Sequence, residues 1–380
     1  MRKKLKDVCM FYSGTGFPIQ YQGQTKGEYP FYKVGDIANN AIAGKIYLEL
    51  CNNYISSDVA KMIKGCILPK DTVVFAKIGE ALKLNRRAIT SCDCLIDNNA
   101  MGIAPKLDSL RIQYFYFCMK NLKMQTLAES TTVPSVRKTV LEKYEIEVPS
   151  LVEQEEIEKK LTLTQKIIEK RRQELSYLDE IIKARFVEMF GDPVKNPKGW
   201  EVVTIGDIVT EVRYGTSKPA VEGGKYPYLR MNNLTADGHL DLNDLKYIDI
   251  PDDEIEKCVV RKGDVLFNRT NSIELVGKTV VFDLQEDMII AGYIIRVRLN
   301  KRLLPEILSQ YMNLEALKDI LRSMAKGAVN QANINAQELR SIKVYIPDME
   351  LQKQFIEMKN QVDKSKFDTM TFAPIYDIIN

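Results

Sequence analysis

The chain has 380 residues, of which 45% are hydrophobic, and a formal net charge of +3. These values predict a folded protein of two or three domains and exclude global disorder. No apolar run approaches the roughly 18 residues that a membrane-spanning helix needs. The basic start turns polar without the apolar core of a signal peptide, and seven cysteines in so long a chain make no disulfide framework. We therefore expect a cytoplasmic protein with reduced thiols and no membrane partner.

The charge is unevenly distributed. Residues 1–150 contain 21 Lys and Arg against 14 Asp and Glu, whereas residues 200–346 contain 19 against 21. A basic first part favours a polyanionic partner. Any nucleic-acid role of the second part must depend on local clusters of cations.

The first 149 residues show a mixed pattern. The apolar run Thr72–Ala76 predicts a strand, and Ser109–Leu127 predicts a helix. Loops that contain glycine lie between these segments. The pattern indicates an α+β domain.

A long amphipathic segment follows, at Leu151–Phe190, with neither Gly nor Pro. Alternating steps of four and three residues from Ile157 reach ten positions, of which seven are large and apolar. So narrow a seam is typical of a coiled-coil helix. A helix of about 40 residues is roughly 60 Å long, which indicates a spacer between two domains.

The connector Gly191–Trp200 contains two prolines and two glycines, which end the helix. Beyond the connector, four apolar runs predict strands: Val265–Phe267, Thr279–Phe282, Met288–Val297 and Ile342–Ile346. The segment Pro305–Lys326 predicts a helix. A second seamed helix of about 20 residues is predicted after Pro347, and a tail with Pro374 ends the sequence.

The two flanks of the long helix form an approximate repeat. Four anchor segments recur at offsets of 200, 197, 192 and 198 residues, the last measured from Pro149 to Pro347. The pairs are Leu5–Gly16 with Ile205–Ser217, Tyr29–Asn40 with Tyr226–Asp237, Asp71–Gly79 with Gly263–Asn271, and Tyr144–Leu161 with Ser341–Met358. Two copies are too few for a solenoid. They fit two similar globular domains, each followed by a helix.

We therefore predict an α+β fold with two similar globular domains joined by a long helix. The expected segments are a first domain (1–149), a spacer helix (150–191), a connector (192–200), a second domain (201–346), a distal helix (347–368) and a tail (369–380). The two helices would pair antiparallel as a coiled coil through Leu161, Ile168, Leu175, Leu178 and Ile182 on one side and Leu351, Phe355, Met358 and Val362 on the other. The distal helix is about half as long and covers only part of the long seam. The rest is covered by another subunit or by a second copy of the chain in a homodimer, or it is left exposed.

This plan resembles the specificity subunit of type I restriction-modification systems. The resemblance is carried by three features: the connector Phe190–Trp200, the strings GDVLF and RMNNL of the second copy, and a closing motif. That motif consists of Pro149, Glu153, Gln154 and Ile157 in the first copy and of Pro347, Leu351 and Gln352 in the second. It implies that each domain is a target-recognition domain that reads one half of a split double-stranded DNA sequence. The helices would then set the spacing and dock methyltransferase subunits.

The resemblance further implies a non-catalytic chain that binds no cofactor of its own. The methyltransferase and restriction subunits would use S-adenosylmethionine, ATP and Mg²⁺. The sequence departs from the family in its short distal helix.

Sequence reading also needs side chains that present fixed donors and acceptors to base edges, and hydroxyls that hold phosphates. The candidates of this kind are Ser13, Thr15, Lys33, Lys77, Lys83, Arg86, Arg87, Tyr214, Thr216, Ser217, Lys218, Arg230, Asn232, Asn233, Arg269, Asn271, Lys326, Asn330 and Gln331. Arg269 is the first choice because it directly follows the strand Val265–Phe267. Each candidate is also compatible with a solvated surface loop, and Asn232, Asn233 and Asn271 are common turn residues.

Other functional classes have less support. The sequence lacks a GxxxxGK[ST] phosphate loop and a methyltransferase motif, and its one histidine, His239, lies in a polar turn. The acidic run Asp249–Glu256 is more typical of an exposed loop than of a metal site. The main alternative is a coiled-coil interaction protein with two protein-binding domains and no role on DNA, and a nuclease or methyltransferase is a more distant one.

Overall fold

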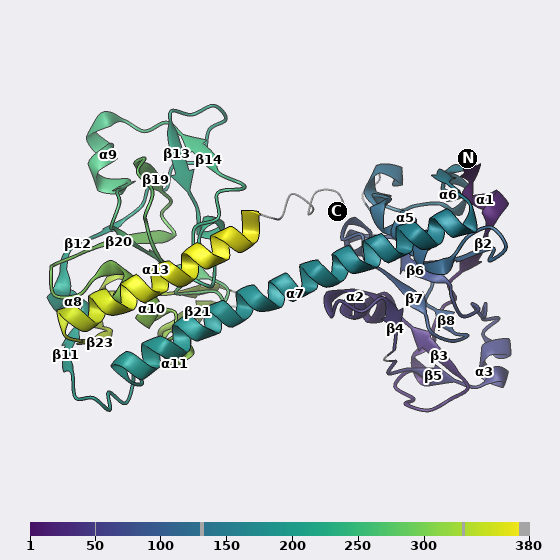
Figure 1. Ribbon diagram of the computed structural model, residues 1–380, viewed down its shortest axis with the longest axis horizontal. Coiled ribbons are helices and arrows are strands. Elements are labelled where there is room, and N and C mark those ends of the chain that lie inside the picture. Colours follow the sequence, from purple (N-terminus) through teal and green to yellow (C-terminus); the bar gives the residue numbers. More distant parts are fainter. Residues whose placement is uncertain (50, 130–132, 329–330, 372–380) are drawn as a thin grey trace. The chain divides into compact units, whose positions relative to one another are not determined.

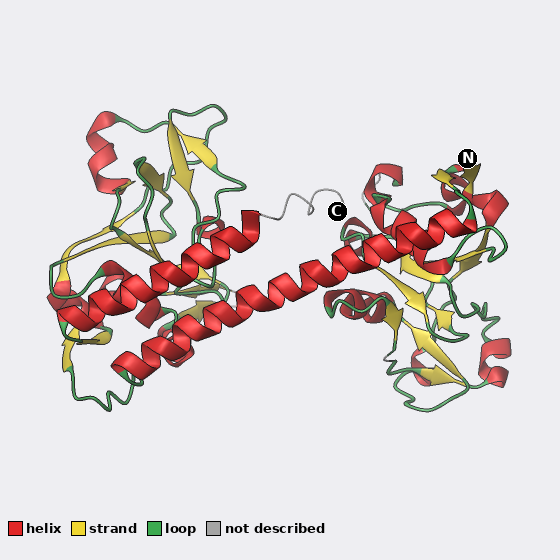
Figure 2. Cartoon of the chain, viewed as in Figure 1, coloured by secondary structure: helices red, strands yellow, loops and turns green. Residues whose placement is uncertain are grey.

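The structure is a computed structural model that describes residues 1–49, 51–129, 133–328 and 331–371. The described chain divides into two compact units, and the boundary falls between Lys170 and Arg171. It lies within one continuous helix, α7 (Leu151–Phe190), whose bounds are those predicted. Both units mix helices with strands (Figures 1 and 2), which confirms the α+β fold class.

The first unit is built around a five-stranded sheet with the order β2-β9-β6-β7-β4, beside a three-stranded sheet β5-β3-β8 and a pair β1-β10. Its strands are β1 (Arg2–Lys4), β2 (Cys9–Ser13), β3 (Tyr29–Tyr32), β4 (Tyr47–Leu48), β5 (Tyr54–Ile55), β6 (Val73–Ala76), β7 (Arg87–Thr90), β8 (Leu95–Ile96), β9 (Ala100–Pro105) and β10 (Glu145–Glu147). Its helices before α7 are α1 (Leu5–Val8), η1 (Ile19–Tyr21), α2 (Val34–Ile42), α3 (Ser57–Met62), α4 (Glu80–Lys83), α5 (Ile112–Asn121), η2 (Met124–Leu127) and α6 (Lys138–Lys143).

The second unit repeats this plan with two four-stranded sheets, β12-β20-β16-β18 and β14-β13-β19-β15, a three-stranded sheet β17-β22-β21 and a pair β11-β23. Its strands are β11 (Glu201–Thr204), β12 (Val209–Tyr214), β13 (Tyr226–Leu229), β14 (Lys246–Ile248), β15 (Val259–Val260), β16 (Val265–Asn268), β17 (Thr270–Asn271), β18 (Thr279–Val281), β19 (Met288–Ile290), β20 (Ile294–Leu299), β21 (Lys326–Ala328), β22 (Gln331–Asn333) and β23 (Lys343–Ile346). Its helices after α7 are α8 (Ile205–Ile208), η3 (Met231–Asn233), α9 (Asp252–Cys258), α10 (Pro305–Met312), α11 (Glu315–Met324), α12 (Ala336–Ser341) and α13 (Met349–Thr371).

The central strand of each unit contributes side chains to two hydrophobic cores. Val73 and Phe75 of β6 face the core that α5 covers, while Val74 faces the opposite core. In β16, Val265 and Phe267 likewise face one core and Leu266 the other. Side chains of a strand alternate between its two faces, so a strand buried on both faces has a continuous apolar run.

A buried glutamine explains the proline-then-glutamine motif of each copy. Gln154 donates from Nε2 to the Pro149 carbonyl (2.9 Å) and accepts from the Arg111 amide (2.9 Å), at the start of α5. Gln352 does the same with Pro347 (2.8 Å) and with Leu304 (2.9 Å), at the start of α10. Both glutamines are 0% exposed. Each one therefore joins a long helix to a core helix by satisfying a helix-terminal N–H group.

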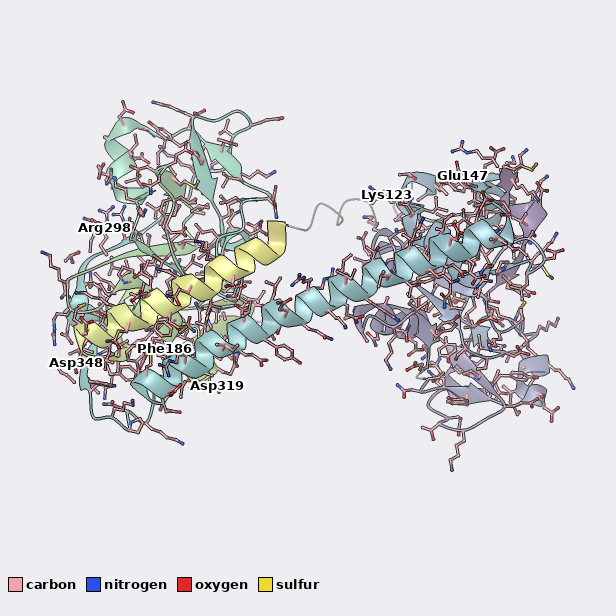
Figure 3. The ribbon with its side chains drawn as sticks, viewed as in Figure 1. Lys123, Glu147, Phe186, Arg298, Asp319 and Asp348 are labelled. Carbon is pink, nitrogen blue, oxygen red and sulfur yellow. The ribbon has the colours of Figure 1, made fainter. Side chains whose placement is uncertain are left out.

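Helices α7 and α13 pair antiparallel through the C-terminal part of α7. Phe186 and Phe190 of α7 contact Phe355 of α13 edge to face, with ring centroids 5.2 and 5.6 Å apart. Lys366 Nζ, further along α13, lies 2.5 Å from Asp179 Oδ1, further back on α7. The helices therefore run in opposite directions, and Phe186 lies between them (Figure 3).

The predicted pairing residues of α7 have different partners. Ile182 shares a core with all four predicted residues of α13. Leu161 instead packs against the core of the first unit, so its assignment to the helix pair is wrong. Ile168, Leu175 and Leu178 are half-buried and belong to neither of these two cores among the described residues.

Three sequence-based element predictions are too long. The predicted helix Ser109–Leu127 covers the separate elements α5 and η2, and the other two predictions are each interrupted by a distant contact. The predicted helix Pro305–Lys326 is broken into α10 and α11 at Asn313, whose Nδ2 donates to the Thr279 carbonyl at 2.6 Å. The predicted strand Met288–Val297 is broken into β19 and β20, because Ala291 leaves the strand to bridge Thr216. In both cases a contact distant in sequence interrupts a continuous apolar pattern.

Candidate nucleic-acid interface

Each unit carries a tight glycine–threonine turn after its first long strand. A Cβ atom added at Gly14 would lie 1.7 Å from the carbonyl oxygen of Asp97, and one added at Gly215 would lie 2.1 Å from that of Ile290. Only glycine allows these close approaches. In the first unit the amide of Thr15 then donates across to the next sheet. The predicted loops at Ser13–Gly16 and Tyr214–Lys218 therefore pack their first glycine against a neighbouring backbone in the same way.

Lys77 follows the central strand β6 of the first unit. Its amide donates to the Asn99 carbonyl at 2.9 Å, and its carbonyl accepts from the Val136 amide at 2.9 Å. The backbone is thus fixed on both sides, and the side chain is half-buried. Lys77 is therefore a cationic residue whose backbone is held by hydrogen bonds on both sides.

Arg269 has the same place after β16 in the second unit. Its amide donates to the Tyr293 carbonyl at 3.0 Å, and its carbonyl accepts from the Ile334 amide at 2.9 Å. The guanidinium lies over the ring of Tyr214, with Cζ 5.0 Å from the ring centroid. The Tyr214 hydroxyl accepts from the Ala336 amide at 2.8 Å. Arg269 and Lys77 therefore occupy equivalent positions in the two units, and Tyr214 holds the guanidinium.

The Nε of Arg269 is buried without a hydrogen-bond partner among the described residues. Next to it, Asn268 is 0% exposed and donates from Nδ2 to the carbonyls of Thr270 and Tyr293, both at 3.2 Å. Asn268 Oδ1 in turn accepts from Asn271 Nδ2 at 2.9 Å. This network presents Arg269, Asn271 and the half-exposed Tyr293 together.

Two candidates, Arg87 and Asn233, are corrected because they are buried. Arg87 is 2% exposed, and its guanidinium donates to the carbonyl and side-chain oxygens of Asn85 at 2.7 and 2.8 Å. Asn233 is 1% exposed; it accepts from the Arg230 amide at 2.9 Å and donates to the Asp241 carbonyl at 2.8 Å. Both side chains hold the fold together, so we remove them from the proposed interface.

Several other candidates are accessible but have partners within the chain. Lys83 pairs with Glu80 at 2.7 Å, Lys218 with Glu254 at 3.0 Å, and Arg230 with Asp244 at 2.7 Å. The exposed candidates are Ser13, Lys83, Tyr214, Ser217 and Asn232, and the half-buried ones are Thr15, Lys33, Lys77, Arg86, Thr216, Lys218, Arg230, Arg269 and Asn271. Asn330 lies outside the described residues, and the side chains of Lys326 and Gln331 are not described. Among these candidates, the structure brings Tyr214 and Arg269 of the second unit into direct contact.

The sequence did not identify Tyr293 as a site residue. It is 51% exposed and its carbonyl supports both Asn268 and Arg269. The segment Ala291–Gly292–Tyr293 looked like the middle of a strand because apolar residues flank it. The glycine within that run was the one available signal of a turn.

Enzyme-like features are few in the described chain. His239 is exposed, with Nδ1 3.4 Å from Asp237 Oδ2. Hydrogen bonding to His239 holds the pKa of Asp237 well below its usual range. No group of three or more His, Cys, Asp or Glu that could hold a metal ion lies among the described residues. No described helix is long and apolar enough to span a membrane.

Comparison with known proteins finds one family in both halves of the chain. A family model described as the type I restriction modification DNA specificity domain matches residues 1–177 and 197–373. The putative type I restriction enzyme MjaX specificity subunit of Methanocaldococcus jannaschii is 32% identical over 171 residues, which are 44% of this chain and 40% of that protein. The type I restriction enzyme EcoKI specificity subunit of Escherichia coli K12 is 25% identical over 256 residues, which are 63% of this chain and 55% of that protein. The alignments thus span about half the length of these relatives.

One solved structure has a similar fold over the whole chain. It is described as showing the structural basis of complex assembly and conformational transition of the type I R-M system. The alignment covers 100% of this chain and 95% of that chain, with a TM-score of 0.56 and 17% identity. At this identity the likeness concerns the fold alone.

Proposed function

Because the chain belongs to the family of type I restriction modification DNA specificity domains, we propose that it is the specificity subunit of a type I restriction-modification complex. Each of its two domains, which we place at residues 1–149 and 201–346, reads one half of a bipartite DNA sequence. The chain is non-catalytic, binds no cofactor of its own and acts in the cytoplasm. The alternative of a coiled-coil interaction protein without DNA is not favoured, because the family match covers both domains.

The observation that carries this proposal is that each domain holds a cationic side chain at an equivalent place in its fold. Lys77 and Arg269 follow equivalent strands and make equivalent pairs of backbone hydrogen bonds. Both residue types make hydrogen bonds to guanine edges in the major groove, and Arg does so with fixed bidentate geometry. Two similar supports with different side chains fit a protein that reads two different half-sites.

Helix α7 supports the proposal that other subunits dock on this chain. Its exposed large apolar side chains are Leu151, Val152, Leu163, Ile167, Tyr177, Ile181 and Val187, with exposed fractions of 41 to 71%. We propose that methyltransferase subunits cover part of this surface, and that restriction subunits join through them. These partners would supply S-adenosylmethionine, ATP and Mg²⁺. A homodimer through the half-buried Ile168, Leu175 and Leu178 would be a competing use of the same helix.

The test is sequencing of the methylated bases in cells that express this chain with its methyltransferase partner. The expected result is one bipartite motif, methylated on adenine in both halves and absent from cells without this chain. A continuous motif would contradict reading by two domains. If no new methylation appeared although the two proteins co-purified, the proposed function would be wrong.

A further inference from the structure

An open apolar hollow of about 610 Å³ lies in the first domain, between the loop after Gly14 and helix α3. Phe17 and Tyr21 line it from the loop, and Met62 lines it from α3. Met62 is 67% exposed, and Ile19, on the same loop, is 87% exposed. The described chain therefore leaves a concave apolar surface uncovered beside the glycine–threonine turn.

The walls of the hollow are fixed. Phe17 stacks on the fully buried Phe31, with ring centroids 3.8 Å apart and planes within 8°. The Tyr21 hydroxyl donates to the Met62 sulfur at 3.2 Å. Aromatic stacking on one side and a hydrogen bond on the other hold the loop against α3, so the hollow is present before any ligand binds.

A cation stands at the edge of this apolar surface. Lys33 Nζ lies 5.6 Å from the centroid of the Phe17 ring and donates to Gln22 Oε1 at 2.6 Å. The surrounding residues 1–150 carry 21 Lys and Arg against 14 Asp and Glu. A ligand that has both a negatively charged backbone and an apolar group is complementary to this surface. Duplex DNA offers one such group in the major groove, the 5-methyl of thymine.

The second domain has an ion pair at the equivalent place. Lys218 follows its glycine–threonine turn where Phe17 follows that of the first domain. Lys218 Nζ lies 3.0 Å from Glu254 Oε1 of α9, the helix that follows the edge strand as α3 does. An ion pair thus joins loop and helix where the first domain has an aromatic-walled hollow. The two domains therefore differ at this place, as expected of a feature that determines which bases each domain reads.

We propose that this hollow receives the 5-methyl group of a thymine in the half-site read by the first domain, and thereby specifies that base. The inference rests on the proposed function. Gly16 and Phe17 would bring the base edge against Met62, while Lys33 attracts the neighbouring phosphate. The open volume exceeds that of one methyl group, so the edge of the base pair enters with it.

The test uses the full chain with its methyltransferase partner and duplexes in which deoxyuridine replaces each thymine in turn. Deoxyuridine keeps the base pairing and removes only the methyl group. One substitution in the half-site of the first domain should weaken binding about fourfold, the effect of one buried methyl group. Met62→Ser, at an exposed position, should bind the thymine and deoxyuridine duplexes equally. The matched control Met10→Ser, 54% exposed in the same domain but outside the hollow, should keep the discrimination.

Three results would overturn the inference. The first is binding with no thymine-to-deoxyuridine difference in that half-site, or a half-site without thymine. The second is a Met62→Ser variant that keeps full discrimination but no longer retains its protein partner, which would make the hollow a protein-docking surface. The third is no binding to any duplex, which would overturn the proposed function as well; the first two leave that function intact.

Discussion

Lys318 places an ammonium group inside the second unit, where it is 8% exposed. Its Nζ donates to the Gly277 carbonyl at 2.6 Å and to Asn313 Oδ1 at 2.9 Å. Burial lowers the pKa of Lys318 to about 8, from an ordinary value near 10.5. Between these two pH values the unfolded chain binds more protons than the folded one. The stability of this unit therefore rises as pH increases from about 8 toward 10.

Lys318→Met should remove that rise. The full effect of a shift of about 2.5 pKa units is roughly 3 kcal/mol, and part of it should appear between pH 7 and 9.5. Denaturant unfolding followed by the fluorescence of Trp200, the one tryptophan of the chain, reports on this unit. Burial also lowers the pKa of the nearby Lys278, so the difference between the variant and the wild type isolates Lys318. Equal pH slopes for both proteins would contradict the prediction.

Lys77 and Arg269 should each govern one half-site. Arg269→Ala should weaken recognition of one half by about 1–3 kcal/mol, the contribution of a bidentate base contact. Lys77→Ala should weaken recognition of the other half. Binding to duplexes randomised in one half at a time measures the two effects separately. Arg302→Ala, which removes a surface ion pair with Glu201, is the control and should change neither.

If either variant lost both halves equally, a folding defect would be indicated in place of a lost base contact. The two positions were recognisable in the sequence because each follows the central apolar run. Arg87 is also a cationic residue in a predicted loop, but its side chain is buried. Its burial depends on the carbonyls of Asn85 and Leu122, and the latter contact is distant in sequence. A local sequence pattern identifies a cationic residue in a loop, but it does not show which distant residues will cover its side chain.

At the scale of elements, strand β20 is attached to β12 by a buried charge network. Arg296 is 0% exposed and lies 2.7 Å from Glu211 Oε2, which Arg298 also contacts at 2.9 Å. Burial alone would raise the pKa of Glu211, but the hydrogen bond from Arg213 and the charges of Arg296 and Arg298 outweigh it and lower that pKa. The carboxylate is therefore the anion on which the buried Arg296 depends.

Glu211→Ala should destabilise the second unit by about 3–5 kcal/mol, because it removes the carboxylate that pairs with the buried guanidinium of Arg296. Glu201→Ala is the matched control. Glu201 pairs with Arg302 on the surface, where its side chain is 61% exposed, so its loss should cost about 0–1 kcal/mol. The midpoint of urea unfolding, again followed by Trp200 fluorescence, compares the two. Similar midpoints for the two variants would show that the network is not essential.

The sequence predicted the positions of helices and strands better than it predicted which surfaces these elements pack against. The bounds of α7 follow from a seam without Gly or Pro, and the central strands follow from continuous apolar runs that are buried on both faces. The seam did not reveal that Leu161 packs on the first unit while Ile182 packs on α13. A periodic pattern defines an apolar face, and any nearby apolar surface can cover it. The breaks at Asn313 and Ala291 depend on contacts that only the folded chain forms.

At the scale of the whole molecule, the two domains differ in charge although they share a fold. Residues 1–150 carry seven more cations than anions, and residues 200–346 carry two fewer. We expect the first domain to supply more of the phosphate contacts, and the logarithm of the binding constant to fall with the logarithm of salt by about 0.9 per contact. Lys33→Ala should therefore reduce the salt slope by about 1 and weaken binding to all sequences alike. Asn271→Ala, which carries no charge, should leave the slope unchanged. Fluorescence anisotropy between 50 and 300 mM salt measures both. An unchanged slope for Lys33→Ala would place the electrostatic contacts elsewhere on the chain or on its partners.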